Sequence, residues 1–399
     1  MEKRKRAAAR LASTALKIYS VADNIISPLG SDTHQNFRAL LRGESAIQKI
    51  KAGPLFPEPL YAAWTGDLLQ EPFEAEAAHC YTRLEKGFIR SIQAVLDTVP
   101  GIRKERLALV ISSTKGNIDL LGVEQPGAIG AERLELPAMA GSIGRFFGLA
   151  NAPVVVSNAC ISGVSAILVA KKLICMGRYD HVLVSGGDLL DKFILSGFQC
   201  LKALSEEPCK PYDADRRGIN LGEAVGTMLI SKDPLLNTNK SSLALIAGGG
   251  QSNDANHISG PSRTGKGLKI AVNGAIKSAG LPVSELGYIN AHGTATLFND
   301  EMEAVAFNDL GLEALPLNSL KGYFGHTLGA AGVVESIMTI WQLNHQQLVK
   351  SLGYAVSGVS RDLNVLQENQ QPAQLQYVLK TGSGFGGCNA AVIYGKAWI

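Results

Sequence analysis

Apolar and polar positions along the first part of the chain alternate between short β-rich runs and longer helical patterns. Branched apolar residues form strand-like runs, and a helical pattern lies between the second and third of them. The predicted strands are Leu107–Ile111, Val154–Val156 and His181–Ser185, and the predicted helix runs from Ile161 to Met176. This order is typical of βαβ units in a largely parallel sheet.

The second part of the chain repeats the pattern. Its predicted strands are Leu243–Ala247, Tyr288–Ala291 and Pro316–Ser319, followed by a helix from Ala330 to Leu343. Each part also closes on a glycine-rich turn before a strand, Gly222–Gly226 before Thr227–Ser231 and Gly382–Gly387 before Ala390–Tyr394. We infer a degenerate duplication with a boundary between Asp233 and Ser241, where Pro, Asn, Thr and Lys collect. The predicted units are a tail at 1–16 and α/β halves at 17–235 and 236–399.

Composition is that of a compact globular protein. Of 399 residues, 46% are hydrophobic and 18% are charged, which argues against a disordered or fibrous chain. The net charge of +3 is too small to predict nucleic-acid binding. The six cysteines form no CxxC pair, so neither a zinc site nor a disulfide framework is indicated. Free thiols fit a reducing compartment, and we expect a cytoplasmic protein.

Two segments resemble targeting or membrane sequences only superficially. The basic residues Lys3 to Arg6 precede an apolar stretch that Arg10 interrupts, which favours a solvated tail over a signal peptide. The uncharged run from Val154 to Ala170 falls short of the roughly 20 residues that span a bilayer. A buried strand that turns into a buried helix explains this run, and no membrane association is expected.

Three small-residue motifs carry the candidate chemistry. They contain one thiol and two imidazoles, at Cys160 in Ser157–Gly163, His292 in Asn290–Thr296, and His326 in Lys321–Gly332. Alone, such a cysteine is often an inert core residue and such a histidine is often structural. Together they indicate one acyl-transfer site. Cys160 lies where the predicted helix begins, and the helix N-terminus is expected to lower its thiol pKa and to offer backbone N–H groups to an oxyanion.

These residues resemble the β-ketoacyl synthase family, the condensing enzymes of fatty-acid and polyketide synthesis. The resemblance runs from Lys17 to Tyr394. Five blocks match in order: the Cys160 turn, Pro211–Gly226, the His292 motif through Asp300 and Glu303, Lys321–Gly332, and Gly384–Gly387. It implies the thiolase fold, in which two duplicated α/β halves form layers in the order α-β-α-β-α.

The resemblance also implies a role for each matching residue. Cys160 is the nucleophile, His292 and His326 assist decarboxylation and stabilise an enolate, and Lys321 orients that site. Asp300 and Glu303 could cap a helix, but the resemblance places Glu303 in a supporting network around Lys321. Phe385 gates the acyl channel, and its backbone N–H shares the oxyanion hole with Cys160. The supporting residues Thr294 and Thr296 belong to the His292 motif.

The expected activity is a decarboxylative Claisen condensation between an acyl group on Cys160 and malonyl-acyl carrier protein. The resemblance implies no cofactor and no metal, an acidic acyl carrier protein as partner, and a homodimer or a heterodimer with a synthase-like subunit. A thiolase with Cys388 as a second active cysteine and a non-catalytic chain-length subunit are the alternatives.

Some residues depart from the family pattern. Leu297 and Phe298 replace a Pro-led turn, and Asn299–Glu303 resembles polyketide-type synthases. The segment Gly260–Lys266 nearly fits a P-loop, but Gly267 occupies the place of the magnesium-binding Ser or Thr. We predict that His257–Gly267 forms a loop at the rim of the site.

Overall fold

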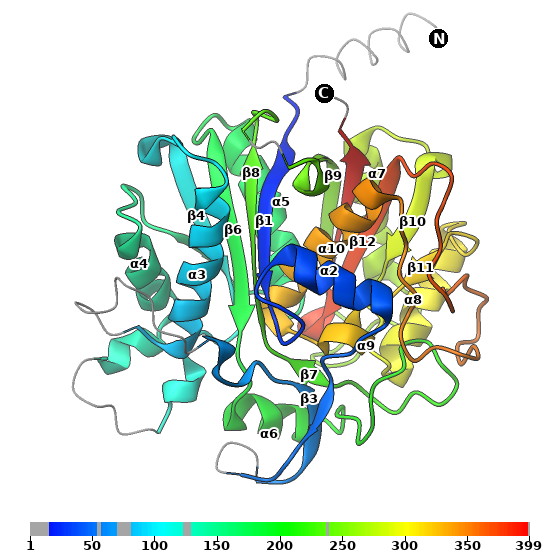
Figure 1. The fold of residues 1–399 in the computed structure, drawn as a ribbon. Helices are drawn as coiled ribbons and strands as arrows, with labels where there is room; N and C mark the ends of the chain where they lie inside the picture. Colours follow the sequence, from blue (N-terminus) through cyan, green and yellow to red (C-terminus); the bar gives the residue numbers. More distant parts are fainter. Residues whose placement is uncertain (1–15, 54–56, 70–80, 123–128, 237–238, 398–399) are drawn as a thin grey trace, which may run out of the picture.

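The computed structural model describes residues 16–53, 57–69, 81–122, 129–236 and 239–397. The predicted tail at 1–16 therefore falls almost entirely outside the described residues. Ten strands form one mixed sheet (Figure 1). Their bounds are β1 (Tyr19–Ile26), β4 (Leu107–Ser112), β5 (Val154–Val156), β6 (His181–Asp188), β8 (Ala224–Ser231), β9 (Ala244–Asn253), β10 (Leu286–Asn290), β11 (Leu317–Asn318), β12 (Tyr377–Gly384) and β13 (Cys388–Lys396).

The helices and a small second sheet complete the fold. The helices are α2 (Thr33–Arg42), α3 (Arg83–Asp97), α4 (Leu136–Phe146), α5 (Ser162–Cys175), α6 (Lys192–Cys200), α7 (Lys266–Ala279), α8 (Leu297–Asp309), α9 (Lys321–Phe324) and α10 (Ala331–His345). The small sheet consists of β2 (Gln48–Ile50), β3 (Leu60–Ala63) and β7 (Leu221–Gly222). Among the described residues, no helix has both the length and the apolar character needed to cross a membrane.

The strand order shows the duplication that the sequence suggests. From the middle of the sheet outward, one side runs β1-β8-β6-β4-β5 and the other runs β9-β13-β12-β10-β11. On each side the first two pairings are antiparallel and the last two are parallel. The two sides meet through a short antiparallel pairing of Tyr19 and Ser20 with Leu245 and Ala244. Along the chain, β8 is the last strand of the first side and β9 is the first strand of the second side. We therefore propose that the domain boundary lies between them, around the predicted position 235/236.

Helices pack in three layers around these two sets of strands. Helices α5 and α10 contact each other and strands from both sides, so they form the central layer. Helices α3 and α4 pack on the first side, and α7 packs on β9 and β13 of the second, with α8 against it. A central apolar core around α5 and α10 lies between two outer cores. In Figure 1 the first side lies at the left and the second at the right.

Most predicted elements are present with shifted ends. Helix α5 begins at Ser162, one residue later than predicted, and β9 continues six residues beyond the predicted end at Ala247. The glycine-rich segments are largely strand: β8 already starts at Ala224, and β12 continues to Gly384, so the turn before β13 is reduced to Phe385–Gly387. Glycines are tolerated in these strands because neighbouring groups approach closely there. A Cβ on Gly226, for example, would lie 3.0 Å from a Val334 methyl carbon.

Two glycines bring the central helices into backbone contact. A Cβ on Gly163 of α5 would lie 2.6 Å from the Val333 nitrogen, and one on Gly332 of α10 would lie 2.3 Å from the Val164 nitrogen. No side chain fits between these segments without displacing backbone. The crossing therefore holds the Cys160 turn, which precedes α5, close to the His326 segment, which precedes α10.

Replacing Gly332 with alanine should lower the free energy of unfolding by about 1–3 kcal/mol, because the added methyl group overpacks this crossing. Urea unfolding of the purified variant measures the change. Gly197→Ala in α6 is the matched control, since a Cβ there meets nothing within 4 Å and alanine favours the helix. Equal stability of the two variants would contradict close backbone packing at Gly332.

Candidate active site

The predicted site residues follow strand ends, and two of the segments, those of Cys160 and His326, follow the equivalent outermost strands β5 and β11. Cys160 follows β5 and precedes α5, and Lys321 and His326 follow β11 and precede α10. His292 follows β10, and Phe385 follows β12. Strands β10, β11 and β12 run parallel to one another, so their carboxyl ends share one edge of the sheet, which is where ligands bind in open α/β sheets.

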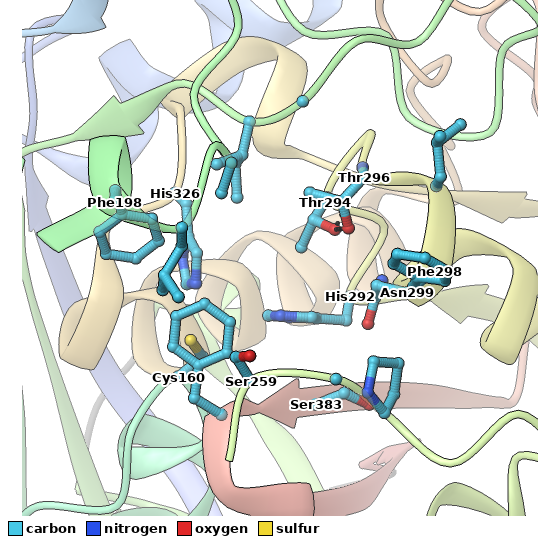
Figure 2. Close-up of a pocket in the computed structure, with 18 of the residues that line it drawn as sticks. Cys160, Phe198, Ser259, His292, Thr294, Thr296, Phe298, Asn299, His326 and Ser383 are labelled. Atoms are coloured by element: carbon cyan, nitrogen blue, oxygen red, sulfur yellow. Dashed lines mark hydrogen bonds between the residues drawn. The ribbon is translucent and has the colours of Figure 1, made fainter. Parts of the chain in front are cut away.

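The structure brings the thiol and both imidazoles together. The sulfur of Cys160 and a ring nitrogen from each of His292 and His326 all lie within 4.8 Å of one another. The two rings are nearly perpendicular, with centroids 5.3 Å apart. Figure 2 shows the histidines reaching toward the sulfur from different segments of the chain. A cysteine and two histidines that lie more than 100 residues further along the chain therefore form a single reactive centre.

Each of the three motifs contains a non-glycine residue with a left-handed backbone. Ala159 has a φ of 45°, Ala295 of 60° and Leu328 of 52°. Such a conformation costs of the order of 1–3 kcal/mol per residue, and the surrounding structure has to hold it in place. Hydrogen bonds do so at Cys160, where Ser162 Oγ donates to the Ala159 carbonyl and accepts from the Asn158 N–H. Strain next to the thiol and both imidazoles points to a function for this backbone.

The reactive centre opens into a cavity of about 670 Å³. Thr294 and Thr296 line it and are hydrogen-bonded to each other through their hydroxyls at 2.8 Å (Figure 2). His257, Ser259, Gly260 and Pro261 form part of the wall, as expected of a rim loop. The size suits a small-molecule or extended thioester substrate.

Phe385 and Phe198 lie side by side in the wall of this cavity. Their ring centroids are 5.7 Å apart with planes tilted by 35°, and both residues line the wall. Phe198 belongs to α6, and the sequence motifs do not include it. The sequence feature that could have indicated Phe198 is its position in the short apolar helix that follows β6.

Two family profiles match the sequence. The profile of the β-ketoacyl synthase N-terminal domain matches residues 124–234, and that of the C-terminal domain matches residues 243–355. Together they cover more than half of the chain. The protein belongs to the β-ketoacyl synthase family.

Relatives of this synthase match over nearly their whole length. The 3-oxoacyl-[acyl-carrier-protein] synthase 2 of Vibrio cholerae is 28% identical, with 93% of this chain and 96% of the relative covered. The putative mitochondrial 3-oxoacyl-[acyl-carrier-protein] synthase of Schizosaccharomyces pombe is 27% identical, with 93% and 97% covered. The protein is thus a condensing enzyme of fatty-acid or polyketide synthesis, an acyltransferase.

A solved ketosynthase has the same fold. The ketosynthase ApeO of Xenorhabdus doucetiae, solved in complex with its chain length factor ApeC, superposes with a TM-score of 0.82 at 26% identity, with 96% of this chain and 98% of that chain covered. A β-ketoacyl synthase of Burkholderia phymatum superposes with a TM-score of 0.82 at 22% identity, covering 96% and 100%. The thiolase fold expected from the sequence is therefore confirmed.

Cys160, the candidate nucleophile, rests as a thiol, contrary to the expectation from its place before a helix. Burial raises the pKa of Cys160 to about 11, although Lys321 and hydrogen bonds from the backbone N–H groups of Phe385 and Cys160 lower it. The helix argument considered only the local segment, whereas desolvation by the folded chain has the larger effect. The two N–H groups that reach the sulfur are those expected to bind an oxyanion.

Both imidazoles are neutral. Burial lowers the pKa of His326 to about 3 and that of His292 well below its usual value, and the positive charge of Lys321 lowers both further. The Leu328 N–H donates to Nδ1 of His326 at 3.2 Å, so the ring proton lies on Nε2. This Nε2 is buried and has no hydrogen-bond partner among the described residues. A donor in this state is ready for an anionic oxygen.

Lys321 pairs with a glutamate that the sequence motifs did not single out. Its ammonium lies 2.8 Å from Oε1 of Glu335 in α10, and Lys380 of β12 lies 2.6 Å from Oε2 of the same carboxylate. All three side chains are buried. Glu303, which was expected in a network around Lys321, makes different contacts.

Glu303 and Asp300 hold the backbone of the His292 loop. Glu303 accepts hydrogen bonds from the N–H groups of His292 and Gly293, at 2.9 and 2.7 Å. Asp300 accepts from the N–H of Thr294 at 2.8 Å. Both carboxylates are fully buried in α8. They support the site by fixing the loop rather than by capping their own helix, which begins at Leu297 without a side-chain cap.

The thiol and the two histidines could also ligate a soft metal ion, since Cys and His are the ligands of catalytic zinc sites. The electrostatic environment opposes a cation. Lys321 lowers the pKa of all three residues, which means that the local potential is positive. This potential favours an anionic reaction centre.

Proposed function

We propose that this synthase catalyses a decarboxylative Claisen condensation, in which an acyl group on Cys160 is extended by a malonyl thioester. The observation that carries the proposal is the approach of the Cys160 sulfur and the two neutral imidazoles to within 4.8 Å at the cavity. A nucleophile that forms thioesters and a pair of uncharged N–H donors are what the two half-reactions need.

In the first half-reaction, Cys160 attacks the carbonyl carbon of an acyl thioester. A new carbon–sulfur bond forms, and the negative charge moves onto the carbonyl oxygen, where the N–H groups of Cys160 and Phe385 can stabilise it. The bond to the donor sulfur then breaks. The proton lost from Cys160 leaves with the departing thiol, so the step needs no net acid or base.

In the second half-reaction, the bond between the malonyl α-carbon and its carboxylate breaks and carbon dioxide leaves. The electron pair passes to the α-carbon and the thioester oxygen as an enolate, which His326 Nε2 and His292 can stabilise by hydrogen bonding. The enolate carbon attacks the acyl-Cys160 carbonyl. Collapse of that intermediate breaks its carbon–sulfur bond, and the released Cys160 thiolate takes up one proton to restore the thiol.

The proposed substrates are acyl and malonyl thioesters of an acyl carrier protein. Support comes from the names of the bacterial and yeast relatives, which cover 93% of the chain. The exposed side chains of Lys202 and Arg217 line the cavity and supply positive charge for an acidic carrier. We further propose that the protein acts as a dimer. The ApeO structure, solved with a chain length factor, supports a heterodimer as an alternative to a homodimer.

Release of labelled carbon dioxide from malonyl-carrier thioester tests the proposal. The acyl-loaded wild-type protein should release it together with a product two carbons longer. His326→Ala should slow the release by about 100-fold or more, since an enolate donor is lost, while acyl loading of Cys160 persists. Product formed without carbon dioxide release would instead support the thiolase alternative. Cys388 is not among the described residues that line the cavity, which disfavours that alternative.

A further inference from the structure

Lys380 is a fully buried lysine in the middle of the C-terminal part of the sheet. It lies in β12, five residues before Phe385, and its side chain is 1% exposed. Its ammonium contacts two oxygens, Oε2 of Glu335 at 2.6 Å and the Thr381 carbonyl at 2.6 Å. Lysine is almost never fully buried unless it is paired.

The partner of Lys380 is already paired. Glu335 also accepts from Lys321 through its other oxygen at 2.8 Å. With both lysines protonated, the buried cluster holds two ammonium groups and one carboxylate and carries one excess positive charge; burial lowers the pKa of Lys380, and Glu335 raises it. Lys321 and Glu335 alone would form a neutral pair. A second buried lysine adds a desolvation penalty that packing does not require, because an apolar side chain of similar length would fill the same space.

The excess charge lies near the reaction centre, because Lys380 pairs in the sheet with Asn290, two residues before His292, and Lys321 lies five residues before His326. Lys380 and Lys321 both lower the pKa of His292 and of His326, which places both ammonium groups within electrostatic reach of the imidazoles. Besides the imidazoles, the titratable groups around the cluster include Glu303 of α8, Tyr288 of β10 and the Cys160 thiol before α5. Glu303 is engaged by the His292 loop, so Glu335 is the carboxylate that pairs with both lysines.

We propose that Lys380 is a positioning residue for decarboxylation. It holds Glu335 by its second oxygen, so that Lys321 is fixed beside the two imidazoles, and it adds a buried positive charge that stabilises the developing enolate. This inference rests on the proposed function. Lys380 touches neither the thiol nor a cavity wall, and it acts through Glu335 and through the local potential.

Comparing the rates of acyl transfer and of decarboxylation distinguishes a positioning role of Lys380 from a structural one. Acyl transfer to Cys160 depends on the thiol and on the N–H groups of Cys160 and Phe385, and Lys380 is not among the main influences on that thiol. Decarboxylation builds negative charge beside the imidazoles, where Lys380 has its effect. A merely structural lysine would affect both half-reactions together.

The test compares Lys380→Met with wild type in acyl loading, followed by intact mass spectrometry, and in carbon dioxide release from malonyl-carrier thioester. Methionine matches the length of the side chain and leaves Lys321 and Glu335 as a neutral pair, so the variant should fold. We expect acyl loading within about twofold of wild type and carbon dioxide release slowed about 10- to 100-fold. The value of kcat should fall, with KM for the malonyl substrate little changed.

Two further variants complete the experiment. Lys380→Arg restores the positive charge and should recover part of the decarboxylation rate. Lys232→Met removes a lysine that is 45% exposed and pairs with Asp180, and it should leave both half-reactions unchanged. Equal loss of loading and decarboxylation in Lys380→Met, or no loss of either, would overturn the role. A wild-type protein that loads acyl groups but never releases carbon dioxide would refute the proposed function itself, and this inference with it.

Discussion

Replacing Cys160 with alanine should abolish the acyl-enzyme and, with it, all condensation. In the proposed mechanism the acyl chain is held on this residue, and within the described part of the chain no other thiol lies beside both imidazoles. Cys160 is next to both imidazoles, and its sulfur accepts hydrogen bonds from the backbone N–H groups of Phe385 and Cys160. We expect no mass increase of the variant after incubation with acyl-carrier thioesters, and loss of product by a factor of 10⁴ or more, on the order of the effect of removing a catalytic nucleophile.

The matched control is Cys200→Ala. Cys200 is a free, exposed cysteine at the end of α6, so it reports on adventitious acylation of surface thiols. This variant should load acyl groups like wild type. A stable acyl adduct on the Cys160→Ala protein, mapped by peptide mass analysis to another residue, would show that Cys160 is not the nucleophile.

The sequence motifs predicted which residues form the reactive centre because each motif combines a reactive side chain with small residues. Gly163 and Gly332 permit the crossing of α5 and α10, and the crossing places Cys160 beside His326. The alternation of apolar runs also predicted the βαβ units, but the expected largely parallel sheet was wrong, because the inner strand pairs on both sides are antiparallel. The order of strands across the sheet could not be read from this alternation, since pairing between β1 and β9 depends on residues more than 220 positions apart.

Glu335 and Lys380 were missed although the sequence contained a signal for each. Each is the one Asp, Glu, Lys or Arg residue of its segment, Ala331–His345 for Glu335 and Tyr377–Gly384 for Lys380. A charge in a segment buried on all sides requires a partner. Which charges pair could not be deduced, because Lys321, Glu335 and Lys380 come from α9, α10 and β12 and meet only in the folded chain.

The protonation of the nucleophile also lay beyond local reasoning. A helix N-terminus favours a thiolate when the thiol is solvated. Here the surrounding fold partly shields Cys160, which is half-buried at the cavity, and this desolvation raises the pKa of the thiol to about 11. The same burial keeps the histidines neutral, so one physical cause sets the resting charge of all three groups.

Replacing Glu335 with glutamine should lower the free energy of unfolding by about 3–5 kcal/mol. The amide has no charge to offset Lys321 and Lys380, which would then be two buried ammonium groups facing a neutral side chain. Equilibrium unfolding in urea at neutral pH measures the loss. Glu285→Gln, at an exposed position before β10, changes the same chemical group and should stay within 0.5 kcal/mol of wild type, as is usual for surface substitutions.

The double variant Glu335→Gln/Lys380→Met tests whether the stability lost in Glu335→Gln comes from the unpaired charge of the lysines. It removes one of the two unpaired lysines, so it should recover part of the stability lost in Glu335→Gln, and the two substitutions should be strongly non-additive. If the losses simply add, the lysines do not share Glu335 in solution. The electrostatic account of the site would then have to rest on Lys321 alone.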